Sequence, residues 1–132
     1  MNNESAELID ILLQDENNKL VFRVSELNCS ICVNHIVTKL KEHFPNYSLN
    51  SNIIIIYDSE KLRYSNGMYD KQAYLTNNRS ILGLPAENTN LPFLFILNKD
   101  DMMAKMVFIP DKGMPELTDE YLKIIKKRFF SY

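Results

Sequence analysis

The stretch that decides the fold runs from Lys19 to Phe44 and reads KLVFRVSELNCSICVNHIVTKLKEHF. Its first part is an apolar run from Leu20 to Val24 that predicts a β-strand. Its second part has apolar residues at the spacing of one helix face, namely Val33, Ile36, Val37, Leu40 and Phe44. The only two cysteines of the chain, Cys29 and Cys32, lie where the strand pattern gives way to the helix pattern.

A C-x-x-C pair at the start of a helix is typical of a dithiol redox site. Unpaired backbone N–H groups and the helix dipole stabilise a thiolate there. A cysteine so placed has a pKa in the range of roughly 3.5–7.5 instead of about 8.5. We therefore interpret Cys29 and Cys32 as the candidate catalytic residues, with Cys29 as the attacking thiolate and Cys32 as the resolving thiol.

Two other interpretations of the cysteines remain open at this stage. They are either inert small residues, or ligands of a zinc or copper ion together with His35 and a further group such as His43. A structural zinc site usually needs four ligands, and the chain has no other cysteine. We expect neither a metal nor another cofactor.

The remaining pattern predicts one domain over residues 1–132. An amphipathic helix is expected at residues 5–14 and a strand, buried on both faces, at residues 52–58. A helix is expected at residues 66–76 and a loop at residues 77–90. Two apolar runs around an Asn/Asp turn predict a β-hairpin, and a final helix from Glu116 to Phe130 is expected to bury Leu117, Tyr121, Leu122, Ile125 and Phe129.

Composition excludes several classes of function. A net charge of −2 with both signs interspersed gives no footprint for a nucleic-acid partner. The longest apolar run, Ile53–Ile56, is far too short to span a membrane. The polar start lacks the features of a signal peptide, but a mature exported domain also begins in this way. We slightly favour the bacterial cell envelope, with a leader removed, over the cytoplasm.

In the order of its elements, the chain resembles the thioredoxin-like superfamily. Beside the C-x-x-C pair, Leu91-Pro92 stands just before the hairpin, where the family places a cis-proline facing the cysteines. The Asn98-Lys99-Asp100 turn is similar to the hairpin turn of bacterial envelope members. The resemblance implies a three-layer α/β/α sandwich with a mixed central sheet of about four strands, and an insertion at about residues 59–90. It also implies exchange with a protein disulfide or dithiol, and a substrate groove at Leu91 and Pro92.

The chain departs from the family in the Ser30-Ile31 dipeptide between its cysteines, in its lack of tryptophan and at two further positions. The buried acid that thioredoxin carries six residues before its first cysteine is replaced by Arg23, and the nearest acid is Glu26. Glu26 and His35 are the candidate proton relay, with a plain surface histidine as the favoured alternative for His35. Leu91 is bulkier than the residue that commonly precedes the proline. The alternative function is therefore a redox-inactive thioredoxin-like binding module, with the metal carrier as a further alternative.

Overall fold

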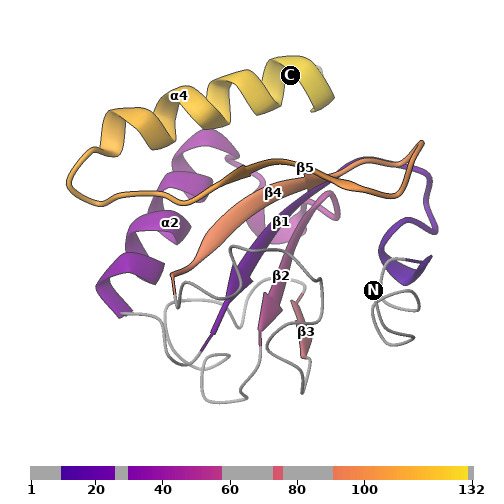
Figure 1. Ribbon diagram of the computed structural model, residues 1–132, viewed down its shortest axis with the longest axis horizontal. Coiled ribbons are helices and arrows are strands. Elements are labelled where there is room, and N and C mark those ends of the chain that lie inside the picture. The colour runs from indigo at the N-terminus through magenta and orange to yellow at the C-terminus, as the bar shows by residue number, and fades with distance from the viewer. Residues whose placement is uncertain (1–9, 26–29, 58–72, 76–90, 131–132) are drawn as a thin grey trace.

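A five-stranded mixed sheet organises the protein. The computed structural model describes residues 10–25, 30–57, 73–75 and 91–130. The strands lie in the order β3-β2-β1-β4-β5, and their bounds are β1 (Lys19–Val24), β2 (Ile53–Tyr57), β3 (Ala73–Leu75), β4 (Phe93–Leu97) and β5 (Ala104–Phe108). The chain is thus an α/β protein with a mixed sheet, as the sequence predicts (Figure 1).

Strand β1 lies at the centre of this sheet. It pairs in parallel with β2, from Leu20 opposite Ile53 to Val24 opposite Tyr57. Its other edge pairs antiparallel with β4, where Arg23 lies opposite Phe93. The predicted hairpin is confirmed, because β4 and β5 are antiparallel neighbours.

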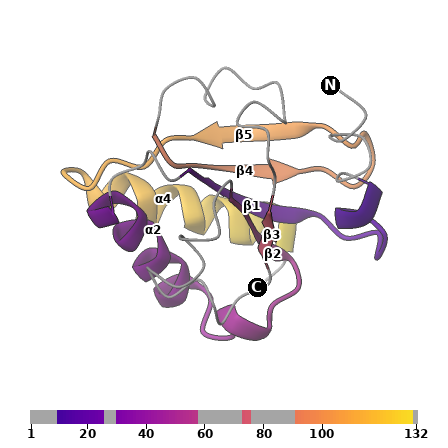
Figure 2. The ribbon, with the colours of Figure 1, turned by 90° about the horizontal axis from the view of Figure 1, so that it is seen from below.

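Two helices cover one face of the sheet. Helix α2 (Ser30–His43) follows β1, and helix α4 (Pro115–Ile125) follows β5 and continues into the π-helical turn η4 (Lys126–Phe130). Figure 2 shows both helices on the same side of β4 and β5. A short 3-10 turn, η1 (Tyr47–Leu49), leads from α2 towards β2. The end of α2 at His43 agrees with the prediction, because the following Phe44-Pro45 disfavours helical geometry.

Alternation along the strands divides the apolar side chains between two cores. The larger core lies under the helices and includes Leu20, Phe22, Ile53 and Ile55 of the central strands. The smaller core lies on the opposite face and consists of Leu12, Val21, Ile54, Ile56, Phe93, Phe95 and Leu97. Both faces of β2 are therefore buried, which is the reason for its unbroken run of isoleucines.

Three of the predictions need correction or fall partly outside the described residues. The expected helix at 66–76 is wrong at Ala73–Leu75, which forms β3 by pairing in parallel with the open edge of β2. Here strand pairing overrides the local pattern. Residues 10–12 are helical, as expected, and residues 13–14 form a turn. Residues 5–9 of the predicted helix and all of the predicted loop 77–90 lie outside the described parts of the chain.

The buried face of α4 also differs from the prediction. Leu117 is 44% exposed, whereas Thr118 is fully buried together with Tyr121, Leu122 and Ile125. These four residues follow the i, i+3, i+4, i+7 spacing of one helix face, so the hydroxyl-bearing Thr118 takes the place expected for Leu117.

A β-bulge interrupts the pairing of β4 with β5. Leu94 lies opposite Phe108 and Ile96 opposite Lys105. Two residues of β5, Met106 and Val107, therefore lie opposite the single residue Phe95 of β4. Met106 takes a left-handed backbone with φ of 53°. Its carbonyl accepts a hydrogen bond of 2.8 Å from the Tyr121 hydroxyl, which fastens the bulge to α4.

Ile55 provides a test of the larger core. Because its side chain is fully buried, Ile55→Ala is expected to lower the free energy of unfolding by about 2–5 kcal/mol. The matched change Ile124→Ala, at a residue 46% exposed, is expected to alter it by less than about 0.5 kcal/mol. Urea unfolding of both variants measures the difference, and equal losses would contradict the assigned core.

Candidate functional site

Cys32 lies in the first turn of α2, directly after the central strand. Residues 25–29 join the end of β1 to the start of α2 at Ser30. The side chain of Cys32 is partly buried, and the preceding Ile31 is 64% exposed. The part of the chain that the structure describes contains no free thiol. The predicted catalytic partner Cys29 and the candidate relay residue Glu26 lie outside the described residues.

Leu91 and Pro92 lie at the same end of the sheet as the start of α2. They immediately precede β4, and Phe93 pairs with Arg23 near the end of β1. Because β1 and β4 are antiparallel, the beginning of β4 and the end of β1 lie at the same end of the sheet. At this end of the sheet, Leu91 is 47% exposed and Pro92 is buried.

The expected cis-proline is wrong. None of the peptide bonds between described residues is cis, and the bond between Leu91 and Pro92 is among them. The trans form is the intrinsically preferred one at X–Pro bonds. A residue before proline also favours extended geometry, so a trans bond carries the chain directly from Leu91 into β4.

Arg23 is buried, with 4% of its surface exposed, at the position where the resemblance implies a buried acid. Its Nη1 donates hydrogen bonds to the carbonyl of Val24 at 2.8 Å and to the carbonyl of Ile56 at 3.4 Å. The flanking residues Phe22 and Val24 belong to the core under the helices, so Arg23 lies on the opposite face. A buried guanidinium, which remains charged in proteins, thus stands near the end of β1.

His35 lies one helical turn after Cys32 on α2. Its ring is partly exposed, but Nε2 is shielded from solvent and has no hydrogen-bond partner. Residues three apart on a helix are neighbours on its surface. Helix spacing therefore brings His35 and Cys32 to neighbouring positions on the surface of α2.

An ion cluster fixes α2 to α4. His43 Nε2 lies 2.8 Å from Asp119 Oδ1, and Lys39 Nζ lies 2.9 Å from Asp119 Oδ2. The hydrogen bond with His43, followed by the one from Lys39, holds the pKa of Asp119 below its usual value. His43, considered above as a possible metal ligand, is hydrogen-bonded to Asp119 of α4.

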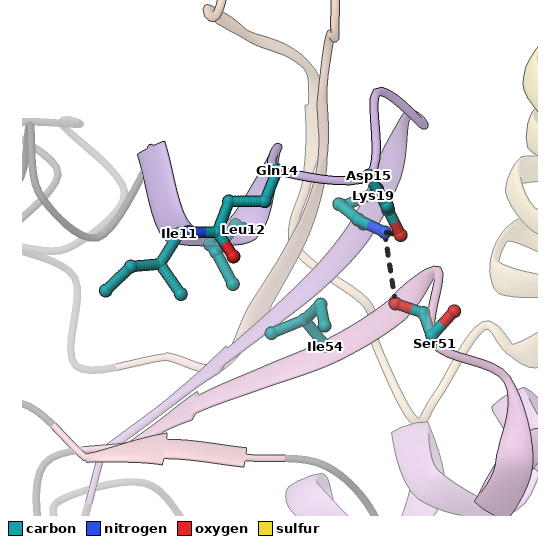
Figure 3. A pocket seen from close by; sticks show the side chains of 7 residues that line it. All are labelled: Ile11, Leu12, Gln14, Asp15, Lys19, Ser51 and Ile54. Carbon is teal, nitrogen blue, oxygen red and sulfur yellow. Dashed lines mark hydrogen bonds and ion pairs between the residues drawn. The ribbon is translucent and has the colours of Figure 1, made fainter.

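A pocket lies beside the start of β1, at the end of the strand opposite α2. This pocket of about 180 Å³ is lined by Ile11, Leu12, Gln14, Asp15, Lys19, Ser51 and Ile54 (Figure 3). Lys19 Nζ donates to Asp15 Oδ2 at 2.6 Å, to the Ser51 carbonyl at 3.3 Å and to Asn52 Oδ1 at 3.0 Å. These three acceptors saturate the ammonium group, so the pocket offers no unused cation for a ligand.

Burial acts to raise the pKa of Asp15, the acidic member of this pocket. The hydrogen bonds from Lys19 and from the backbone N–H of Asn17 outweigh burial and hold that pKa below its usual value. The Lys19–Asp15 pair thereby ties the N-terminal turn to the first residue of β1.

Sequence reasoning did not identify Lys19 and Asp119 as organising residues. A lysine at the edge of the apolar run KLVFRV was a usable signal for Lys19, because that position is on the same strand face as Val21. No local pattern signals Asp119, because its partners Lys39 and His43 are 80 and 76 residues away in sequence.

Comparison with protein-family profiles, curated proteins and solved structures found no significant match. Within the described residues, no helix is both long and apolar enough to cross a lipid bilayer. The same residues contain no group of three or more His, Cys, Asp or Glu side chains arranged to hold a metal ion.

The ion cluster at Asp119 predicts a pH-dependent contribution to stability. A lowered pKa in the folded state stabilises the protein above the unfolded value of about 3.8, and this contribution is lost as pH falls through the folded value. Asp119→Asn is therefore expected to lower the unfolding midpoint at pH 7, with the difference from wild type shrinking below about pH 4.

Thermal unfolding between pH 3 and pH 8 measures this difference. The control is Glu120→Gln, an exposed acid next in sequence, which is expected to leave the midpoint nearly unchanged at every pH. A deficit of the Asp119→Asn variant that is the same at pH 3 and pH 7 would show that the ion cluster is not its cause.

Proposed function

We propose that this protein is a thioredoxin-like thiol–disulfide oxidoreductase that uses Cys29 and Cys32. The proposal rests on one observation, that the first turn of α2 and the Leu91-Pro92 segment lie at the same end of the sheet. The first turn of α2, with Cys32, follows the end of β1, and Leu91-Pro92 leads into the antiparallel neighbour β4. The order β1-α2-β2, hairpin and α4 is the order that the resemblance implies.

The proposed reaction exchanges one disulfide for another. The Cys29 thiolate attacks a sulfur of the partner disulfide, forms a mixed disulfide and releases one partner thiolate. The Cys32 thiolate then attacks Cys29, the Cys29–Cys32 bond forms, and the second partner sulfur leaves as a thiolate that takes up a proton. The two electrons pass from the dithiol to the partner, and the opposite direction uses the same steps.

The chemistry of a helix start supports this assignment. Helix α2 has 14 residues, and its first turn carries no acidic residue whose charge would oppose a thiolate at the positive end of the helix. The absence of a free thiol at Cys32 is compatible with a Cys29–Cys32 disulfide, since the chain has no other cysteine.

Exposed apolar residues support a protein as the partner. Two apolar side chains at this end of the sheet are about half exposed or more. They are Ile31, between the cysteines, and Leu91, before β4. Exposed apolar side chains next to a reactive centre favour an apolar segment of another protein over a small hydrophilic thiol.

A redox-inactive binding module on the same frame is the second candidate. It is favoured by the trans bond at Leu91–Pro92 and by Arg23 in place of the buried acid, because both depart from what the resemblance implies. The two candidates differ in whether the cysteines exchange with a disulfide at all.

Cysteine substitution distinguishes the two candidates. Reduced wild-type protein is expected to reduce a disulfide substrate, and Cys29→Ser is expected to abolish turnover because the nucleophile is gone. Cys32→Ser is expected to accumulate the mixed disulfide, because the first step proceeds and the resolving thiol is missing. Non-reducing electrophoresis and mass spectrometry detect the trapped species.

The control is the double variant Cys29→Ser/Cys32→Ser, which is expected neither to turn over nor to capture substrate. A wild-type protein that fails to reduce any disulfide while it remains folded would support the binding module instead. Capture through Cys32 but not Cys29 would reverse the assigned roles.

A further inference from the structure

We propose that His35 Nε2 accepts the proton of the Cys32 thiol when Cys32 resolves the mixed disulfide, an inference that rests on the proposed thiol–disulfide exchange. The proton passes from Cys32 Sγ to His35 Nε2, and the thiolate then attacks Cys29. The partner sulfur that leaves takes this proton back, so His35 ends each cycle unchanged. With its own proton on Nδ1, the neutral imidazole has an acceptor lone pair on Nε2.

The first argument is the state of Nε2. It is shielded from solvent and has no hydrogen-bond partner, in a ring that is otherwise partly exposed. A buried polar atom without a partner is costly, and such atoms are rare in folded proteins. A thiol proton delivered by Cys32 would satisfy this atom in the reduced protein.

The second argument is the position of His35 on α2. Cys32 and His35 are three residues apart, which brings their Cβ atoms within about 5–6 Å on a helix. Both side chains are partly buried, and the His35 Nε2 atom itself is shielded from solvent. The chain's other histidine, His43, has its Nε2 engaged by Asp119.

The third argument concerns the groups that surround His35. On α2, the nearest described cation is Lys39 one turn further on, and it is bound to Asp119 and to Glu42. On α4, the carboxylate of Asp119 is occupied by Lys39 and His43. In the core beneath α2, the titratable side chains among the described residues are the tyrosines Tyr47, Tyr57 and Tyr121.

The carboxylate of Asp119 is thus engaged by Lys39 and His43 and is not a candidate base for Cys32. The position where the resemblance implies a buried acid holds Arg23, a cation that cannot accept a proton. Imidazole is the side chain suited to exchange a proton near neutral pH. His35, one helical turn from Cys32 and with an unpartnered Nε2, is thus the group that we assign as acceptor of the Cys32 proton.

The test isolates Cys32 as a single thiol. In the Cys29→Ser protein, with EDTA present, the rate of Cys32 alkylation by iodoacetamide is followed from pH 5 to pH 10. An isolated thiol with a pKa of about 8.5 is only about 3% ionised at pH 7, so complete ionisation accelerates alkylation by about 30-fold at most. Adding His35→Asn is expected to slow alkylation about 10- to 30-fold at pH 7, and not at all near pH 10, where the thiol ionises unaided.

The matched control is His43→Asn in the same background, which removes the other histidine of α2 and is expected to leave the alkylation profile unchanged. His35→Leu is expected to slow alkylation like His35→Asn while keeping or raising the unfolding temperature, because it removes a buried atom without a partner. A slower rate with an unchanged fold separates a chemical role from a structural one.

Three outcomes would overturn the inference. They are an unchanged profile in both His35 variants, a deficit that persists at pH 10, and stoichiometric zinc binding to the wild-type protein that is lost with His35→Asn. None of these depends on a partner protein. Failure of wild-type turnover would count against the proposed function, whereas normal turnover with an unchanged His35→Asn profile would count against His35 alone.

Discussion

Burial of β1 on all four sides is the constraint on which the rest of the structure depends. The strand has a parallel neighbour on one edge, an antiparallel neighbour on the other, and an apolar core on each face. Its backbone N–H and C=O groups cannot reach water, so both neighbours must complete the ladder. The pairing therefore fixes at which end of the sheet the chain enters and leaves each of these three strands. Helix α2 and the Leu91-Pro92 segment owe their common location to this arrangement.

Two buried cations lie on the central strand β1. Lys19 and Arg23 are four residues apart on the face opposite the helices, and each is anchored by oxygen acceptors. Lys19 joins the start of β1 to the N-terminal turn and to the residues before β2. Arg23 donates to carbonyls of β1 and β2 at the other end. A buried charge is tolerated only when its hydrogen bonds are satisfied, so these residues fix both ends of the parallel pair.

The sequence predicted the elements whose signal is local. The run of four isoleucines identified a strand buried on both faces, and Phe44-Pro45 marked the end of α2. The short strand β3 was missed because it depends on the open edge of a distant strand. Leu117 was misplaced because the rotation of a helix about its axis depends on what it packs against. At the site, the positions of Cys32 and His35 followed from helix spacing. The burial of Arg23 arises from tertiary contacts, which periodicity does not encode. The trans bond between Leu91 and Pro92 is the locally preferred form, and the cis expectation came from the resemblance alone.

The bulge at Met106 has a consequence for the way in which this sheet meets other molecules. In the order of strands, β5 stands at one end, and it carries the exposed residue Val107 next to the exposed Lys105. A flat edge strand offers its unpaired backbone groups to any extended chain and is a starting point for aggregation. The left-handed residue twists β5 and breaks the regular spacing of those groups, while Lys105 adds a charge that resists close stacking. The protein thereby limits the growth of its sheet through backbone geometry.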